Sequence, residues 1–190
     1  MSTAYRFSVA DYERMIESGV FLDRGDVRTE LIYGEVRIVN PPNPPHEDTV
    51  DVLMYWSVDV TPRDQIRVRV QNSLDIPELD SVPEPDIAWM KVRTDFRTRR
   101  PQPDDVLLLF EVSDSSLAKD RLEKSRLYAE AGIVEYWIVN LVDGRLEIYR
   151  DPCDGIYQSC QTRNRGERIS PLCQPDAWLE VDRALGVREQ

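Results

Sequence analysis

Two acidic residues border apolar segments in a way that suggests a metal site. Glu111 closes an unbroken apolar run that begins at Val106, and Asp86 follows Pro85 at the start of the preceding apolar segment. Burying a carboxylate costs several kcal/mol unless a metal ion or another partner compensates the charge. If the two segments are neighbouring strands, both acids lie at one end of a sheet. Two carboxylates with a backbone carbonyl and waters form the oxygen-rich site that suits Mg²⁺ or Mn²⁺.

Lys124 and Glu30 are two further candidates, and neither is distinctive alone. Lys124 follows Glu111 in a segment of helical periodicity, where it shares a face with Asp120 and Tyr128. Glu30 opens a predicted strand. An exposed lysine on a helix is usually solvated. The hypothesis of a joint site therefore depends on the set of four residues and on their order along the chain.

The acids also have purely structural interpretations, which the sequence leaves open. Glu111 would be unremarkable if the strand simply reached solvent at that residue. An aspartate after a proline, such as Asp86, commonly begins a strand.

Hydrophobic periodicity predicts the elements that position these residues. Before the proline-rich segment 40–45 it predicts a helix from Ser8 to about Ser18 and a β-hairpin around Tyr33-Gly34. After that segment we predict a helix and two strands, over residues 46–60, 65–70 and 85–90.

The second half of the chain predicts a crossover between parallel strands. Apart from Glu111, residues 106–112 are apolar, as in a strand that is buried on both faces. A helix over about 117–131 and a strand over 133–139 follow, and the turn at Asp143-Gly144 leads into one more strand. These elements predict a crossover unit inside a mixed sheet, and hence an α/β (α+β) fold. Residues 151–190 are weakly patterned, with one short strand or turn expected near 177–180 before a frayed tail.

Length and composition limit the classes of protein. With 190 residues, one domain is expected. The three cysteines include no CxxC pair, and the single histidine, His46, excludes sites that need two histidine ligands. No apolar run approaches the roughly 20 residues of a membrane span, so we expect a soluble, cytoplasmic protein. A net charge of −11 argues against a protein that coats nucleic acid over its whole surface.

Local positive charge is concentrated in one predicted loop. The basic residues of this loop are Lys91, Arg93, Arg97, Arg99 and Arg100. They could contact phosphates beside the site, or they could form a solubilising loop balanced by the acids at 104 and 105. His46 has two interpretations as well, as a residue of the active site or as a surface or helix-capping residue.

Several of these segments resemble a known protein family. Pro85-Asp86 and Glu111-Val112-Ser113 are similar to the PD-(D/E)XK nuclease signature, with serine where that superfamily usually has lysine. Residues 110–140, FEVSDSSLAKDRLEKSRLYAEAGIVEYWIVN, closely resemble the Uma2 family (DUF820) of restriction-endonuclease-like proteins, which is abundant in bacteria. The segment ELIYGE at 30–35 and the histidine after the prolines also match that family. The resemblance is strongest over residues 7–150.

The resemblance implies a restriction-endonuclease-like core with a mixed sheet flanked by helices, cleavage of DNA, and a homodimer. Together with the length, it predicts a single domain over residues 1–190 with a weakly patterned C-terminal extension from 151. It implies that Asp86, Glu111 and the Val112 carbonyl hold Mg²⁺ or Mn²⁺, one ion or two. Lys124 would replace the missing lysine from the following helix, and Glu30 would be an additional acid. His46, Arg93, Arg97, Arg99 and Arg100 are the candidate substrate contacts.

The function that follows is a Mg²⁺-dependent endonuclease acting on DNA. Two alternatives stay open at this stage. One is a module that keeps the nuclease fold and binds nucleic acid or protein without cleaving it. The other is a hydrolase of some other phosphoester, which would use the same metal site.

Overall fold

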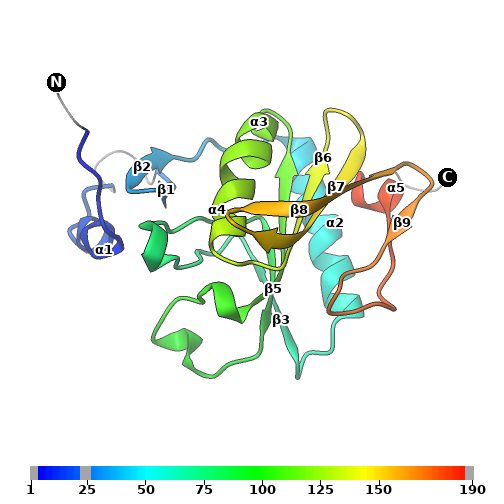
Figure 1. Cartoon of the computed structure of the whole chain (residues 1–190), viewed down its shortest axis with the longest axis horizontal. Coiled ribbons are helices and arrows are strands. Elements are labelled where there is room, and N and C mark those ends of the chain that lie inside the picture. Colours follow the sequence, from blue (N-terminus) through cyan, green and yellow to red (C-terminus); the bar gives the residue numbers. More distant parts are fainter. Residues whose placement is uncertain (1–3, 22–26, 187–190) are drawn as a thin grey trace.

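A six-stranded mixed sheet forms the centre of the protein (Figure 1). The computed structural model describes residues 4–21 and 27–186. The strand order is β3-β4-β5-β6-β7-β8, and only the β5–β6 pair is parallel. The strands are β3 (Ile66–Val70), β4 (Ile87–Lys91), β5 (Val106–Ser113), β6 (Glu135–Asn140), β7 (Arg145–Cys153) and β8 (Ile156–Asn164). The predicted mixed sheet is confirmed.

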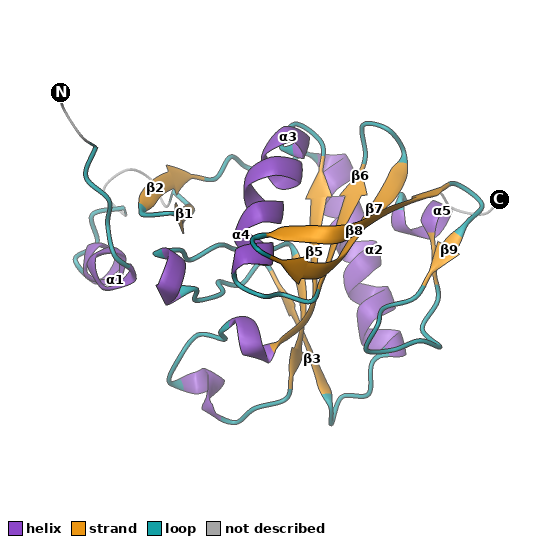
Figure 2. Cartoon of the chain, viewed as in Figure 1, coloured by secondary structure: helices purple, strands orange, loops and turns teal. Residues whose placement is uncertain are grey.

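Helices cover both faces of this sheet (Figure 2). On one face lies α2 (Pro44–Val60), whose Trp56 stacks on Trp89 of β4 with ring centroids 5.2 Å apart. On the other face lies the crossover helix between β5 and β6, whose Leu127 is fully buried. Because both faces are covered, β5 is apolar along most of its length, as the sequence predicted.

Alternation along β5 decides which helix each of its side chains meets. Leu108, Phe110 and Val112 pack in the cluster that contains α2. Leu109 packs in the cluster that contains the crossover helix. Successive side chains of a strand point to opposite faces. Glu111 therefore projects from β5 toward the crossover helix.

The crossover helix is not α-helical throughout, although the sequence predicted one continuous α-helix. It consists of α3 (Leu117–Lys119), a π-helical turn η5 (Asp120–Lys124) and α4 (Ser125–Glu130). Gly132, with φ of +75°, ends it as predicted.

The N-terminal segment forms a helix and a hairpin that pack beside the sheet (Figure 1). Helix α1 (Val9–Glu17) begins at Ser8, which forms a capping box with Asp11. The hairpin pairs β1 (Thr29–Ile32) with β2 (Glu35–Ile38), and Gly34 in its turn has φ of +76°. Both elements were predicted. Their role for the site is to bring β1, and Glu30 within it, against the segment that precedes β4.

The C-terminal residues contribute more regular structure than their weak pattern predicted. Strand β8 pairs with β7 along nine residues at the sheet edge, where polar side chains face solvent. The chain then forms β9 (Arg168–Ile169), β10 (Leu179–Glu180) and α5 (Val181–Ala184). The short strand expected near 177–180 is therefore present as β10. The predicted tail beyond 186 lies outside the described residues.

Among the described residues, no helix has both the length and the apolar composition that crossing a membrane requires.

Candidate functional site

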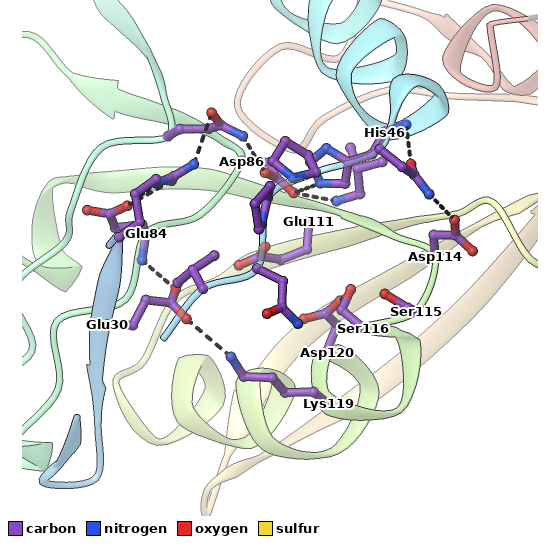
Figure 3. A pocket seen from close by; sticks show the side chains of 18 of the residues that line it. Glu30, His46, Glu84, Asp86, Glu111, Asp114, Ser115, Ser116, Lys119 and Asp120 are labelled. Carbon is purple, nitrogen blue, oxygen red and sulfur yellow. Dashed lines mark hydrogen bonds and ion pairs between the residues drawn. The ribbon is translucent and has the colours of Figure 1, made fainter. Parts of the chain in front are cut away.

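A cavity of about 580 Å³ opens at the carboxyl end of β5. Its wall combines the first turn of α2, the loop before β4, strand β1 and the start of the crossover helix (Figure 3). All four residues singled out in the sequence line it, namely Glu30, Asp86, Glu111 and Lys124. The fold thus brings together residues that are 94 positions apart from first to last.

Asp86 is held at the sheet end by three donors. Its Oδ2 accepts a hydrogen bond from the Val112 amide at 2.9 Å, and the Nε2 of His46 lies 3.1 Å from the same oxygen. Its Oδ1 accepts from the Gln71 side chain at 3.2 Å. Burial alone would raise the pKa of this carboxyl, but the hydrogen bond and charge of His46 and the Val112 amide outweigh it and lower the pKa. The ionised carboxylate form of Asp86 is therefore favoured.

Glu111 is almost completely buried and is held by the crossover helix. Its Oε1 accepts hydrogen bonds from Lys124 Nζ and from the Tyr128 hydroxyl, both at 2.8 Å. Burial raises the pKa of Glu111. The charge of Lys124 opposes that rise, whereas the nearby carboxylates of Asp86 and Asp120 add to it. A proton or a bound cation on Glu111 is therefore favoured over the bare carboxylate.

Lys124 joins Glu111 to the third acid. Its Nζ lies 3.2 Å from Glu30 Oε1. Burial alone would lower the pKa of Lys124, but Glu111 and Glu30 outweigh it and raise that pKa well above its ordinary value. Lys124 is accordingly a cation, although only 7% of its side chain is exposed.

Glu30 is buried in β1 and ionised. Its Oε1 accepts from the Glu84 amide at 2.8 Å, and Lys119 Nζ lies 3.2 Å from its Oε2. Burial opposes ionisation, but Lys124 and Lys119 outweigh it and lower the pKa of Glu30 to about 2.

Ser113 fixes the start of the crossover helix. Its hydroxyl donates to Asp120 Oδ2 at 2.7 Å, and Ser116 donates to the same oxygen at 2.5 Å. Ser113 is the serine that stands where the nuclease signature usually has lysine. In this chain that position anchors the helix that carries Lys124.

His46 belongs to the site and does not cap the helix. Asn43 is the cap of α2, and its side chain accepts from the His46 amide. The imidazole of His46 is thereby free to reach Asp86 (Figure 3).

The predicted arginine patch is balanced by nearby acids. Arg93 and Arg99 both pair with Asp95 and Asp105. Arg100 pairs with Glu13 and donates to Ser73, and Arg97 is exposed. None of these four arginines is among the described residues that line the cavity. The geometry favours the solubilising loop over direct contact with a substrate in the cavity.

Two residues at the site were missed in the sequence. Gln71 follows β3 and reaches Asp86 across the sheet end, a contact that no local pattern signals. Lys119 lies next to Glu30. A signal for Lys119 did exist, because the chain has only three lysines and two of them, Lys119 and Lys124, fall in one short helical segment.

The donor set of the cavity suits a hard divalent cation. The described residues contain no group of three His, Cys, Asp or Glu side chains arranged around one metal position. Asp86 and Glu111 nevertheless supply two carboxylates. The Val112 carbonyl points to the same side as its amide, which donates to Asp86. Six carboxylates and three arginine or lysine side chains line the cavity, so a bound cation would relieve an excess of negative charge.

Comparisons with known proteins bear on the family and the fold. The model of the Uma2 family, described as "Putative restriction endonuclease", matches residues 9–182. A crystal structure from Anabaena variabilis, of a "putative nuclease belonging to DUF820", superposes with a TM-score of 0.73 at 12% sequence identity. The match covers 95% of this chain and 98% of that one. At this identity the likeness shows a shared fold. No curated protein matches the sequence.

Proposed function

The chain belongs to the Uma2 family, and from that membership we propose that it is a divalent-metal-dependent endonuclease that hydrolyses DNA phosphodiester bonds. In this proposal Asp86, Glu111 and the Val112 carbonyl hold Mg²⁺ or Mn²⁺. A bound cation of this kind lowers the pKa of an attacking water and stabilises negative charge on the phosphate.

The chain's own residues would supply positioning and charge. Lys124 keeps its proton beside Glu111 and Glu30, so we assign it to orienting the attacking water and neutralising developing charge, and not to accepting a proton. Glu30 would hold Lys124 in place from the side opposite Glu111. His46 would orient Asp86.

One observation carries this proposal. The Nζ of Lys124 lies 2.8 Å from Glu111 Oε1, in the same cavity as Asp86, although no lysine follows Glu111 along β5. This contact supports the proposal that Lys124, from the next helix, takes the part of the lysine in the nuclease signature.

A supercoiled-plasmid nicking assay tests the proposal. The wild-type protein should convert supercoiled to nicked or linear DNA with Mg²⁺ or Mn²⁺ and should be inactive with EDTA. We expect Asp86→Asn and Lys124→Met each to lower the rate at least about 100-fold, because each removes a charge that acts on the transition state. Circular dichroism should show that both variants stay folded.

The matched control for these variants is Glu135→Gln. Glu135 is fully buried and paired with Arg150, but it does not line the cavity. The Glu135→Gln protein should nick plasmid DNA at the wild-type rate, provided that circular dichroism shows it to be folded. Full activity in either site variant would contradict the proposed site.

The alternative of a non-cleaving binding module predicts a different result. The ion-paired arginines at Asp95 and Asp105 favour the protein-binding form of this alternative, because they leave little free positive charge in their loop for a nucleic acid. In that case no metal would promote cleavage and calorimetry would detect no bound cation.

A single domain and a homodimer also remain proposals. Both faces of β5 contribute to the two large hydrophobic clusters, which supports one cooperative unit. We expect one unfolding transition in calorimetry and a dimeric mass in light scattering.

A further inference from the structure

The π-helical turn places two lysines on one face of the crossover helix. Lys119 precedes the turn and Lys124 ends it, so they are five residues apart. In a regular α-helix, residues at this spacing point about 140° apart. Here the Ser125 amide donates to the Asp120 carbonyl, the i to i+5 bond of a π-helix, which brings such residues toward the same side.

Both lysines converge on one carboxylate. Lys119 Nζ lies 3.2 Å from one oxygen of Glu30, and Lys124 Nζ lies 3.2 Å from the other. The Glu84 amide also donates to Glu30. The single negative charge of Glu30 therefore pairs with two lysines. Lys124 has Glu111 as a second acidic partner, whereas Lys119 has Glu30 alone.

Exposure distinguishes the two lysines. Only 7% of the Lys124 side chain is exposed, whereas 35% of the Lys119 side chain is exposed. Among the described residues, Glu30 is the single hydrogen-bond or ion-pair partner of the Lys119 ammonium. Figure 3 shows Lys119 reaching from the helix toward Glu30 at the edge of the pocket. The Lys119 ammonium can therefore bind a further anionic group and donate hydrogen bonds to it.

The other exposed cation of the cavity wall is less available. Arg28 donates to Glu84 Oε2 at 2.8 Å and also to the Gln71 side chain. The carboxylate of Glu84 therefore balances the charge of Arg28. Lys119 is therefore the partly exposed cation of the cavity wall that still has N–H donors free for a phosphate entering the cavity.

We propose that Lys119 binds a phosphate group of the DNA backbone at the mouth of the cavity, held beside Lys124 by Glu30 and by the π-helical turn. This inference rests on the proposed nuclease function and assigns the substrate contact within it. Lys124 remains the buried cation next to Glu111, and Lys119 is a binding residue.

DNA binding in EDTA tests this role without cleavage. Fluorescence anisotropy with a labelled duplex should show that Lys119→Met weakens binding about tenfold at low salt. The slope of log affinity against log salt should fall by about 1, as expected for one lost phosphate contact. Lys119→Arg should restore both values. Lys91→Met is the matched control, since Lys91 is the third lysine, lies outside the cavity, and donates to the Asp104 carbonyl within the loop that the geometry assigns to a solubilising role.

Amine acylation gives a second readout on the unmodified protein. With only three lysines, mass spectrometry can follow each one separately. Saturating duplex in EDTA should protect Lys119 several-fold and leave Lys91 unprotected. An unchanged salt slope in Lys119→Met together with no protection of Lys119 would overturn the proposal.

These outcomes separate the inference from the proposed function. Wild-type protein that cleaves DNA while Lys119→Met keeps its affinity, salt slope and KM would overturn the role of Lys119 alone. Protection of Lys119 without any metal-dependent cleavage would support the phosphate contact and overturn the nuclease. Absence of both binding and cleavage would overturn both.

Discussion

His46 contacts the acid that we place at the metal and has no role in the nuclease signature itself. Its Nε2 lies 3.1 Å from Asp86 Oδ2, which also accepts from the Val112 amide. Residues that hydrogen-bond a metal ligand fix its orientation, and their loss typically costs 10- to 100-fold in metal affinity. In the proposed metal site, His46 would therefore act on Asp86 and through it on the cation.

Replacing this histidine should change the metal requirement more than the maximal rate. We expect His46→Gln to raise the Mg²⁺ concentration for half-maximal nicking about tenfold. Excess Mg²⁺ should restore most of the rate, because Asp86 itself is still present. A Mg²⁺ titration of activity measures both values. An unaltered Mg²⁺ requirement would show that His46 does not position Asp86.

The start of α2 is the element that aims His46. Asn43 accepts from the His46 amide as the N-cap and donates to Asp114 Oδ2 at 2.7 Å. It thereby ties α2 to the loop after β5. The two prolines that follow occupy the first helical turn, where a missing amide hydrogen costs nothing.

Removing this cap should destabilise the protein modestly. Asn43→Ala should lower the free energy of unfolding by about 1 kcal/mol, the usual cost of losing an N-cap. Urea unfolding measures the change. Asn43→Ser is the control, since serine caps helices well and should keep most of the stability. Equal losses in both variants would point to the Asp114 contact and not to the cap.

Elements with strong periodicity could be predicted, and their relative placement followed from simple rules. The apolar run of β5, the helix after it and the apolar start of β6 implied a parallel crossover. Because Asp86 and Glu111 border adjacent strands, the same rules placed both acids at one sheet end. Lys124 and Glu30 were candidates that neither periodicity nor position distinguished, and the family resemblance assigned their roles.

What the sequence did not reveal depends on contacts between distant segments or on weak patterns. The π-helical turn inserts one extra residue into a helix, and the hydrophobic pattern of the sequence does not distinguish such a turn from a regular α-helix. The pairing of Lys119 with Glu30 was therefore missed. Strand β8 is a partly exposed edge strand, which needs no apolar run. The partners of Arg99 depended on the path of the loop before Asp105.

Charge is arranged in separate networks across the protein, and the net value of −11 conceals this arrangement. One network lies in the cavity. Another surrounds Glu147 on β7, which accepts from Arg121, Arg145 and Asn140. Burial would raise the pKa of Glu147, but these donors outweigh it and lower the pKa to about 2.

This second network should make stability depend on pH. A carboxyl whose pKa is lower in the folded state stabilises the fold above its unfolded pKa, and the contribution is lost as pH falls. For Glu147 the window runs from about 4.5 down to about 2. At pH 6 the free energy of unfolding of the wild-type protein should therefore exceed that of Glu147→Gln by about 2 kcal/mol. The difference should shrink toward pH 2.

Urea unfolding of both proteins at pH 6, 4 and 3 measures this difference. Glu180→Gln is the control for the loss of one carboxylate, because Glu180 is exposed and forms no ion pair with the described residues. A difference between wild type and Glu147→Gln that stays constant over this range would contradict the assignment.

The central claim is that Asp86 and Glu111 together hold the divalent cation that makes cleavage possible. Diffraction from crystals soaked in Mn²⁺, collected where manganese scatters anomalously, tests it most directly. Our account predicts an anomalous peak between the Asp86 and Glu111 carboxylates in the wild-type protein and its loss in Asp86→Asn. No peak at that position in the wild-type protein, or an equal peak in Asp86→Asn, would contradict it.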